Sequence, residues 1–320
     1  MKKVLTMTLN PCIDRTVYFE TFYVGATNIV KKVIEEVAGK GINVAVGLSH
    51  INIPVKAMGF AYKEDLQKLY GKLEEERIEY SFVEVDGRLR VNQKLFDESK
   101  AEMTECNEKG NPVRKEDVDL LLKMLREELA DASLLVLSGS VPPGVDANIY
   151  AVMTSMAKET GVKVILDASG KLLAEGVKAG PYLIKPNREE FVKAFLQGSV
   201  PVSMGSENGL EGGVESCMLD KCRELLTEKM THICLSLGEE GAMLISREEA
   251  VADDLGQKLK IVKRPAIPVT IRSLQGAGDA MVAGLCKAIY EEREDKMLEY
   301  GISMAASTIA LEGTRMGRLE

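Results

Sequence analysis

The chain has 320 residues, of which 45% are hydrophobic and 28% charged, and its net charge is -8 at pH 7. This is the composition of an ordinary globular protein that is large enough to bury a full core. An acidic chain does not favour a nucleic-acid partner, and no apolar run approaches the ~20 residues of a membrane span. We therefore expect a cytoplasmic protein with no nucleic-acid or membrane contact.

Short runs rich in Val, Ile and Leu alternate along the chain with longer segments of helical period. The apolar runs occupy residues 4–9, 55–60, 134–140, 162–169, 182–187, 232–238 and 242–246. Apolar residues recur at helical spacing from Val44 to Ile51 and from Val118 to Leu129. This alternation predicts an α/β fold with a mostly parallel central sheet and helices on both faces.

Two regions, residues 15–36 and 88–106, have alternating strand patterns separated by polar turns. They predict a small antiparallel sheet appended to a main domain of residues 1–14, 37–87 and 107–320. The apolar residues at 17, 19, 22 and 24 are too few to form a core of their own, so we expect them to pair with a second copy. Residues 198–216, rich in Gly and Ser, predict a long surface loop. The six cysteines lack metal-ligand spacing and indicate free thiols.

The sequence GAGD, at residues 276–279, leads into an apolar helical pattern. Its glycines allow a tight strand-to-helix turn, whose free N–H groups and helix dipole bind anions. Dinucleotide and P-loop patterns do not match, because Met281 takes the place of the third glycine and no G-x-x-x-x-G-K-[ST] is present. A carboxylate repels the phosphate that such a turn attracts, so Asp279 suggests a general base. The alternative is an ordinary first-turn acid that favours the helix dipole.

Two other stretches carry polar groups at the predicted ends of strands and helices. AGKGINVA, at residues 38–45, begins a predicted helix, and its glycines let a ligand approach Lys40 and Asn43; alternatively, it is a turn with a solvated lysine. LNPCID, at residues 9–14, follows the first predicted strand. Because strand ends border the ligand crevice of an open α/β sheet, Asp14 is placed to meet sugar hydroxyls unless it only forms a turn.

Seven motifs in this order resemble the ribokinase/PfkB family of sugar kinases, in particular its 1-phosphofructokinase and tagatose-6-phosphate kinase branch. They are LNPCID, AGKGINVA, LRVNQKL, SGSVPPG, IKPNREEF, SLGEEGAM and GAGDAMVAG, and the resemblance covers residues 4–315. It implies a ribokinase-like fold in which the two strand regions form a lid over the sugar, often paired with another subunit's lid.

The resemblance also implies roles for individual residues. Asp279 corresponds to the catalytic base, and the anion hole to Gly276, Ala277 and Gly278. The nucleotide-binding positions correspond to Lys185, Asn187, Ser236, Gly238 and Gly241, and Asn187 and Glu190 form the N-x-x-E motif associated with Mg²⁺ through water. The sugar-phosphate pocket corresponds to Asp14, Gly39, Lys40, Asn43, Arg90 and Ser138, where Lys40 and Arg90 neutralise the phosphate that the substrate already carries.

The implied reaction is phosphorylation of a ketohexose monophosphate by ATP and Mg²⁺, with fructose 1-phosphate as the expected acceptor. A tagatose-6-phosphate kinase and an inactive sugar-phosphate sensor are the alternatives. The sequence departs from the family pattern at Gln275, Ala280 and Ile29. At Ile29 the family often has an arginine near the sugar phosphate, and Lys31 or Lys32 is a candidate to replace that cation.

Overall fold

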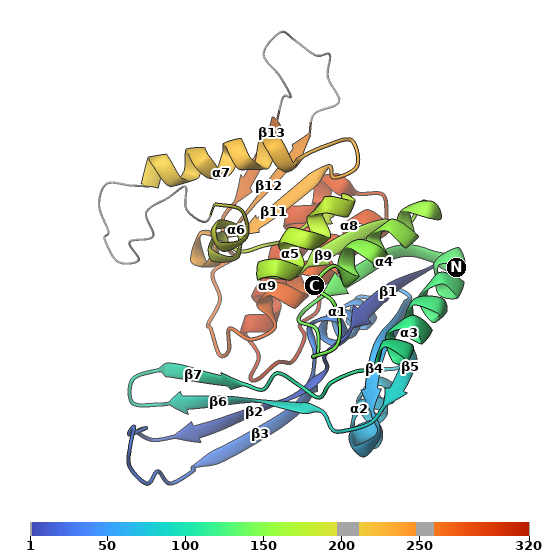
Figure 1. Cartoon of the computed structure of the whole chain (residues 1–320). Coiled ribbons are helices and arrows are strands. Elements are labelled where there is room, and N and C mark those ends of the chain that lie inside the picture. Colours follow the sequence, from blue (N-terminus) through green and yellow to red (C-terminus); the bar gives the residue numbers. More distant parts are fainter. Residues whose placement is uncertain (1, 197–210, 248–258, 320) are drawn as a thin grey trace.

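The computed structural model describes residues 2–196, 211–247 and 259–319. Its main element is a nine-stranded sheet (Figure 1). The strands lie in the spatial order β13 (Leu259–Arg264), β12 (Ala242–Arg247), β11 (His232–Ser236), β10 (Leu183–Ile184), β9 (Lys163–Asp167), β8 (Ala132–Ser138), β1 (Lys3–Thr8), β4 (Val55–Tyr62) and β5 (Glu79–Val85).

The predicted parallel sheet is confirmed, because every neighbouring pair from β11 to β5 is parallel and only β12 and β13 join antiparallel. Each of the seven apolar runs contains one strand. The two outer strands, β5 and β13, were not predicted. They lie at the edges of the sheet, where β13 is largely exposed and β5 is partly buried, and charged residues interrupt the apolar pattern of both.

Helices cover both faces of the sheet, as predicted. One face packs against α3 (Lys115–Glu128), α4 (Ile149–Glu159), α5 (Gly170–Gly176), α6 (Arg188–Phe195) and α7 (Glu211–Leu225). The other face packs against α1 (Lys40–His50), α2 (Leu66–Glu75), α8 (Ala277–Tyr290) and α9 (Met297–Ile309). The helical spacings found from Val44 and from Val118 belong to α1 and α3.

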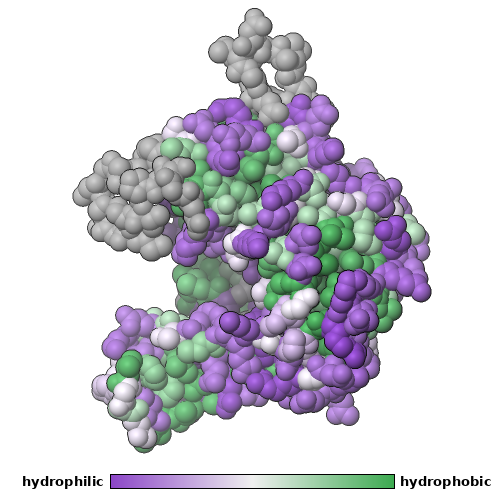
Figure 2. All heavy atoms as spheres, viewed as in Figure 1, coloured by the Kyte–Doolittle hydropathy of each residue, from purple (hydrophilic) through white to green (hydrophobic). Residues whose placement is uncertain are grey.

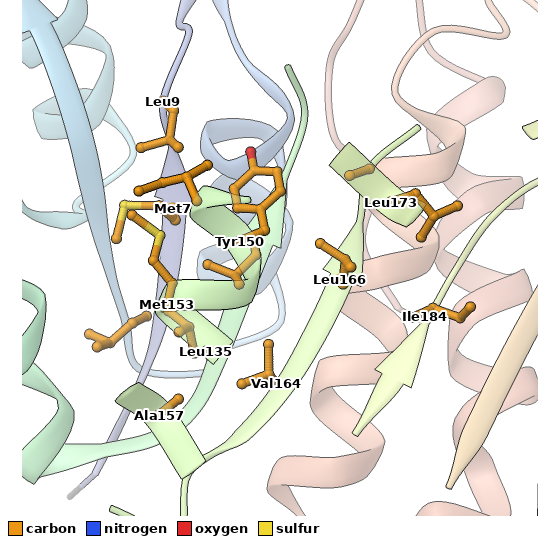
Figure 3. Close-up of a cluster of buried hydrophobic side chains, with 14 of the residues drawn as sticks. Met7, Leu9, Leu135, Tyr150, Met153, Ala157, Val164, Leu166, Leu173 and Ile184 are labelled. Atoms are coloured by element: carbon orange, nitrogen blue, oxygen red, sulfur yellow. The ribbon is translucent and has the colours of Figure 1, made fainter. Parts of the chain in front are cut away.

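Alternation along each central strand divides the core between the two faces. In β8, Leu135 and Leu137 face α3 and α4, whereas Leu134 and Val136 face α1 and α8. Figure 3 shows the first of these cores, where Tyr150 and neighbouring side chains of α4 lie over β1, β8 and β9. The strands are buried on both sides, which fixes their carboxyl ends in one row.

A separate four-stranded sheet lies beside the body in the order β3 (Lys32–Ala38), β2 (Cys12–Phe19), β6 (Arg90–Asp97) and β7 (Glu102–Asn107) (Figure 1). The predicted small sheet is therefore confirmed, but its expected antiparallel pairing is wrong at the centre, where β2 and β6 are parallel. The reason is that β2 follows the carboxyl end of β1 and β6 follows the carboxyl end of β5, and β1 and β5 run in the same direction in the main sheet. Each has its own antiparallel hairpin partner, β3 or β7.

The apolar residues of this small sheet are only partly available to a second copy. Val17 and Phe19 are already buried in the single chain, at 6% and 5% exposure, which contradicts the expectation that they need a partner. Phe22 packs on Phe19 with ring centroids 5.1 Å apart, and its N–H donates to the Asp97 carboxylate. Val24, by contrast, is 92% exposed at the hairpin between β2 and β3.

Three further predictions concern the loop at 198–216, the cysteines and membrane spans. Helix α7 begins at Glu211, so the end of the loop predicted at 198–216 is helical, and residues 198–210 lie outside the described part. All six cysteines are free thiols, as predicted. Among the described residues, no helix is both long and apolar enough to span a membrane.

Gly284 permits the close contact of α8 with α9, and this contact can be tested. A methyl group at this position would lie 2.4 Å from the carbonyl oxygen of Tyr300. The two helices would have to separate, so we expect Gly284→Ala to lower the free energy of unfolding by about 1–3 kcal/mol. Urea denaturation followed by circular dichroism measures the change.

Gly71 in α2 is the matched control, because a methyl group there meets no atom within 4 Å. Gly71→Ala removes only the conformational freedom of an exposed helical glycine, so it should stabilise the protein by up to about 1 kcal/mol. Equal effects of the two substitutions would show that α8 and α9 tolerate a wider spacing.

Candidate active site

Most of the predicted sugar-site residues line one hollow. It has a volume of ≈ 470 Å³ and contains Asp14, Gly39, Lys40, Asn43, Arg90, Ser138, Gly276 and Asp279 among its lining residues. The strand ends of β1 and β8 contribute Thr8 and Ser138, and the small sheet contributes the rest of one wall. In Figure 2 the small sheet stands away from the body across a recess. A second hollow of ≈ 1080 Å³, where β9, β11 and β13 begin, is lined by none of the predicted residues.

The GAGD sequence forms the start of α8, with Gly276 as its N-cap at φ 74°. This left-handed conformation is one that glycine adopts without strain. The first N–H groups of a helix have no partner within it, so the amides that follow Gly276 are available to an anion. The prediction of a strand-to-helix turn is wrong in one respect, because β13 ends at Arg264 and an irregular segment containing two prolines precedes the turn.

Asp279 lies in the first turn of α8 and is buried. Its Oδ2 accepts a hydrogen bond of 2.7 Å from Asn43 Nδ2, so Asn43 orients this carboxylate as well as lining the hollow. Burial raises the pKa of Asp279 to about 6, with a contribution from Asp167, although Lys40 lowers it. A carboxylate with this pKa is ionised at neutral pH and can still accept a proton, which suits a general base.

Asp167 joins two predicted cations beneath this turn. Its side chain has 0% exposure and lies 3.0 Å from Lys40 Nζ and 3.2 Å from Lys185 Nζ. Burial alone would raise the pKa of Asp167, but the two lysines keep it below its ordinary value. Burial alone would likewise lower the pKa of Lys40, which Asp167 and Asp279 raise instead. The charged form of Lys40 is therefore favoured, and Asp167 holds the ammonium groups of both lysines in place.

Arg90 presents a charge of a different kind to the hollow. Its Nε and one terminal nitrogen donate to the carbonyl oxygens of Asn10 and Glu108, at 3.2 and 3.1 Å, and to the amide oxygen of Asn92 at 2.8 Å. All three acceptors are neutral. Within the described ranges, no carboxylate forms an ion pair with Arg90, so its charge remains available to an anionic ligand.

Asp14 lies on β2, which belongs to the small sheet, and does not directly follow the first strand as predicted. Its Oδ1 accepts from Asn92 Nδ2 at 3.0 Å, and its Oδ2 accepts from Lys94 Nζ at 2.7 Å. Asp14, Asn92 and Lys94 share the face of the small sheet that lines the hollow. This wall is therefore polar, which suits a ligand rich in hydroxyl groups.

Three buried oxygens of the hollow have no hydrogen-bond partner in the described chain, namely Thr8 Oγ1, Asn10 Oδ1 and Ser138 Oγ. Thr8 and Ser138 are register partners at the ends of β1 and β8. Buried polar atoms without partners are rare in folded proteins and call for an explanation such as a ligand or water. Their position is consistent with the sugar-binding role predicted for Ser138.

The predicted nucleotide residues follow the next strands of the same sheet edge. Asn187 and Ser236 form an isolated parallel bridge beyond β10 and β11, and a methyl group on Gly278 would lie 3.5 Å from Lys185 Nζ. Gly238 has φ 61° and open space beside it, so a ligand can approach its backbone. The fold itself also requires a glycine at position 241, because a methyl group there would lie 2.1 Å from the carbonyl oxygen of Arg264.

The N-x-x-E motif forms a capping box at the start of α6. Asn187 Oδ1 accepts from the Glu190 N–H at 2.7 Å, and Glu190 Oε2 accepts from the Asn187 N–H at 2.9 Å. Among the described residues no group of three or more potential ligands could hold a metal ion by itself. Mg²⁺ is often bound by one carboxylate and water together with substrate phosphates, and Glu190 is the carboxylate that this motif contains.

Sequence reasoning assigned no role to Asp167, Lys94, Asn92 or Cys12, although all four contact predicted site residues. The signal for Asp167 was its position directly after the apolar run of β9 at the carboxyl edge of the sheet. Lys94 and Asn92 alternate with apolar residues in β6, but their importance depends on strand pairing. Lys31 and Lys32, proposed to replace a missing cation, instead pair with Glu98 and Glu312.

The fold and the hollow define a phosphotransferase that acts on a sugar hydroxyl, with a helix N-terminus beside a buried carboxylate. The chain belongs to the pfkB family of carbohydrate kinases, whose sequence profile matches residues 7–319. Kinases of this family use ATP.

Individual relatives agree with this assignment. A 1-phosphofructokinase of Vibrio cholerae is 29% identical over 324 residues, covering 100% of this chain and 93% of that protein. The crystal structure of a possible 1-phosphofructokinase from Thermotoga maritima has a TM-score of 0.75 at 27% identity, covering 99% of this chain and 95% of the other. Phosphofructokinase-2 from Escherichia coli, at 24% identity and a TM-score of 0.81, covers 99% and 96% and shows the same fold.

The pKa of Asp279 predicts the acid side of the pH profile. A general base must be deprotonated, so kcat/KM should fall about tenfold per pH unit below pH 6 and level off above it. Initial rates from pH 5 to 8 test this expectation. Asp279→Asn should lower turnover by roughly 10²–10⁴ and lose this acidic limb. A wild-type profile that stays flat to pH 5 would contradict the assignment.

The same variant gives a check on stability. Because the fold raises the pKa of Asp279, the ionised carboxylate destabilises the folded state above pH 6, and this effect is absent below the unfolded value near pH 3.8. Asp279→Asn should therefore be more stable than the wild type at pH 8, by an amount on the order of 1–3 kcal/mol, and equal to it at pH 4. A variant that is inactive because it unfolds would show the opposite difference.

Proposed function

We propose that this kinase transfers the γ-phosphoryl group of ATP to the primary hydroxyl of a ketohexose monophosphate, with fructose 1-phosphate as the acceptor and fructose 1,6-bisphosphate as the product. One observation carries the proposal. A buried carboxylate with a pKa of about 6 shares its hollow with a guanidinium that forms no ion pair in the described chain. The relatives named 1-phosphofructokinase support the choice of acceptor.

In the proposed reaction, Asp279 takes the proton of the sugar hydroxyl as the hydroxyl oxygen bonds to the γ-phosphorus and the bond to the ADP oxygen breaks. The N–H groups that follow Gly276 stabilise the charge on the transferred phosphoryl group. The sequence places Lys40 beside the phosphate already on the sugar, but Lys40 and Lys185 share Asp167 and Lys185 lies near Gly278. We therefore assign both lysines to the transferred group. Asn187 and Glu190 would hold Mg²⁺ through water, and the ion would supply positive charge to the phosphates.

Arg90 is the proposed partner of the phosphate that the substrate already carries. A protein of net charge -8 repels anions, so selectivity for a phosphosugar requires a local cation. The guanidinium meets only neutral acceptors in this structure and gains a charged partner when a phosphate enters. A neutral sugar provides no such partner, and the charged side chain then loses solvation without compensation.

A panel of acceptors tests the substrate class. We expect fructose 1-phosphate to exceed free fructose in kcat/KM by at least about tenfold to a hundredfold, since a charge-assisted contact contributes about 1.5–3 kcal/mol. Tagatose 6-phosphate belongs in the same panel. If its kcat/KM is higher than that of fructose 1-phosphate, tagatose 6-phosphate is the substrate. Turnover of fructose equal to that of both phosphosugars would refute a phosphosugar kinase, and a protein that binds them without turnover would be a sensor.

Arg90→Met should reduce kcat/KM for the phosphosugar by the same factor and leave the KM for ATP within about twofold. Arg88→Met is the matched control, because Arg88 precedes the same strand but pairs with Glu108 at 3.0 Å. Its kinetic constants should stay near those of the wild type.

We further propose that residues 15–36 and 88–106 act as a lid that joins two copies of the chain, as the family resemblance implies. The support is a group of exposed apolar side chains around the β2–β3 hairpin, Tyr23, Val24, Ile29, Val30 and Val33. Exposed groups of this kind mark interaction surfaces. The occupant is a second lid, since its matching apolar side chains would bury the same group.

Ile29→Lys tests the dimer, because Ile29 is 88% exposed and a lysine there places a charge in the proposed interface. We expect the wild type to be a dimer at micromolar concentration by light scattering and the variant to dissociate at least tenfold more readily. Val152→Lys on α4 makes the same chemical change outside the lid and should remain dimeric. A monomeric wild type would contradict the proposal.

A further inference from the structure

Lys94 connects the small sheet to the residue that precedes the anion-binding turn. Its side chain is 8% exposed, and its Nζ donates to Asp14 Oδ2 and to Gln275 Oε1, both at 2.7 Å. Gln275 Nε2 also lies 3.8 Å from the sulfur of Met103 in β7. Gln275 therefore contacts two strands of the small sheet, while its own backbone leads directly into Gly276.

The Lys94–Gln275 bridge links two parts of the chain because its donor is buried. An ammonium group carries three N–H donors, and Asp14 and Gln275 accept two of them. Moving either acceptor away would leave a buried charge with one hydrogen bond fewer, which is strongly unfavourable. The side chain of Gln275 is thus held by the small sheet, and its backbone N–H is held by Ser273 Oγ at 3.2 Å.

Gly276 transmits the position of Gln275 to the turn. Glycine has no side chain to fix it, and its φ of 74° is one of several conformations open to it. The direction of the amides at the start of α8 consequently depends on how the preceding residue is anchored. At the other end of the bridge, Asp14 lines the hollow, so a sugar hydroxyl bound there competes directly with Lys94 for Asp14.

We propose that Lys94 and Gln275 are positioning residues that couple a sugar bound at Asp14 to the geometry of the anion hole at Gly276–Gly278. The inference rests on the proposed function of this site. The consequence is selectivity for the acceptor. The turn is aligned for phosphoryl transfer when the small sheet holds a sugar, so water is a poor acceptor of the phosphoryl group when no sugar is bound. Loss of the bridge uncouples ATP hydrolysis from sugar phosphorylation.

Gln275→Leu keeps the size of the side chain and removes its hydrogen bonds. With the full-length enzyme, we expect kcat for sugar phosphorylation to fall about tenfold while the KM for ATP stays within about twofold. The amount of ATP hydrolysed per sugar phosphorylated should rise at least about fivefold. Gln275→Glu keeps an acceptor for Lys94 and should restore the wild-type ratio. A ratio unchanged in Gln275→Leu would overturn the proposal. A ratio in Gln275→Glu as high as in Gln275→Leu would also overturn it, because the glutamate provides the acceptor that Lys94 needs.

A second measurement requires no turnover. Hydrogen exchange of the amides at 280–284 should be about tenfold faster in Lys94→Met and in Gln275→Leu than in the wild type without ligands. Lys100→Met is the control, since Lys100 lies in the turn between β6 and β7 and pairs locally with Asp97. Unchanged exchange in both test variants would refute the bridge even if the enzyme phosphorylates sugars. Faster exchange in a protein that phosphorylates no sugar would support the bridge and refute the proposed function.

Discussion

The burial of charge beside the glycine turn at the start of α8 is the constraint on which the site depends. Asp167 is fully buried and is compensated by Lys40 from the start of α1 and by Lys185 after β10. Removing one partner from such a group leaves an uncompensated charge and costs about 3–5 kcal/mol. The three elements must therefore meet at the carboxyl edge of the sheet, and their meeting fixes two cations beside the place where α8 begins.

Asp279 depends on the same arrangement. Its carboxylate is desolvated because α8 is packed on all sides, against α1 and the sheet on one side and α9 on the other. Desolvation and Asp167 favour the neutral acid, while Lys40 and the amide of Asn43 favour the anion. The balance places the pKa near 6, which neither an exposed aspartate nor one buried without cations would have. The pKa of Asp279 thus depends on the packing of α8.

The small sheet completes the site from the opposite side without a large core of its own. Its pairing register places Asp14, Asn92 and Lys94 on one polar face, and its apolar side chains lie mainly on the other. Polar contacts hold it to the body, among them Lys94 with Gln275, Lys32 with Glu312, and Glu36, which accepts from the Thr314 N–H at 2.7 Å. A sheet held by a few polar contacts can shift more readily than one buried on both faces.

The sequence by itself determined the features that depend on local patterns. These include the buried strands, the helices with apolar stripes, the glycine turn before Asp279 and the existence of a small second sheet. It did not determine the edge strands β5 and β13, whose charged residues interrupt the apolar pattern, or the parallel pairing of β2 with β6. The contacts within the site could not be predicted from the sequence either, because Lys40 and Asp167 are 127 residues apart in the chain and Lys94 and Gln275 are 181 apart. Such pairs follow from strand order and burial, which only the tertiary structure decides.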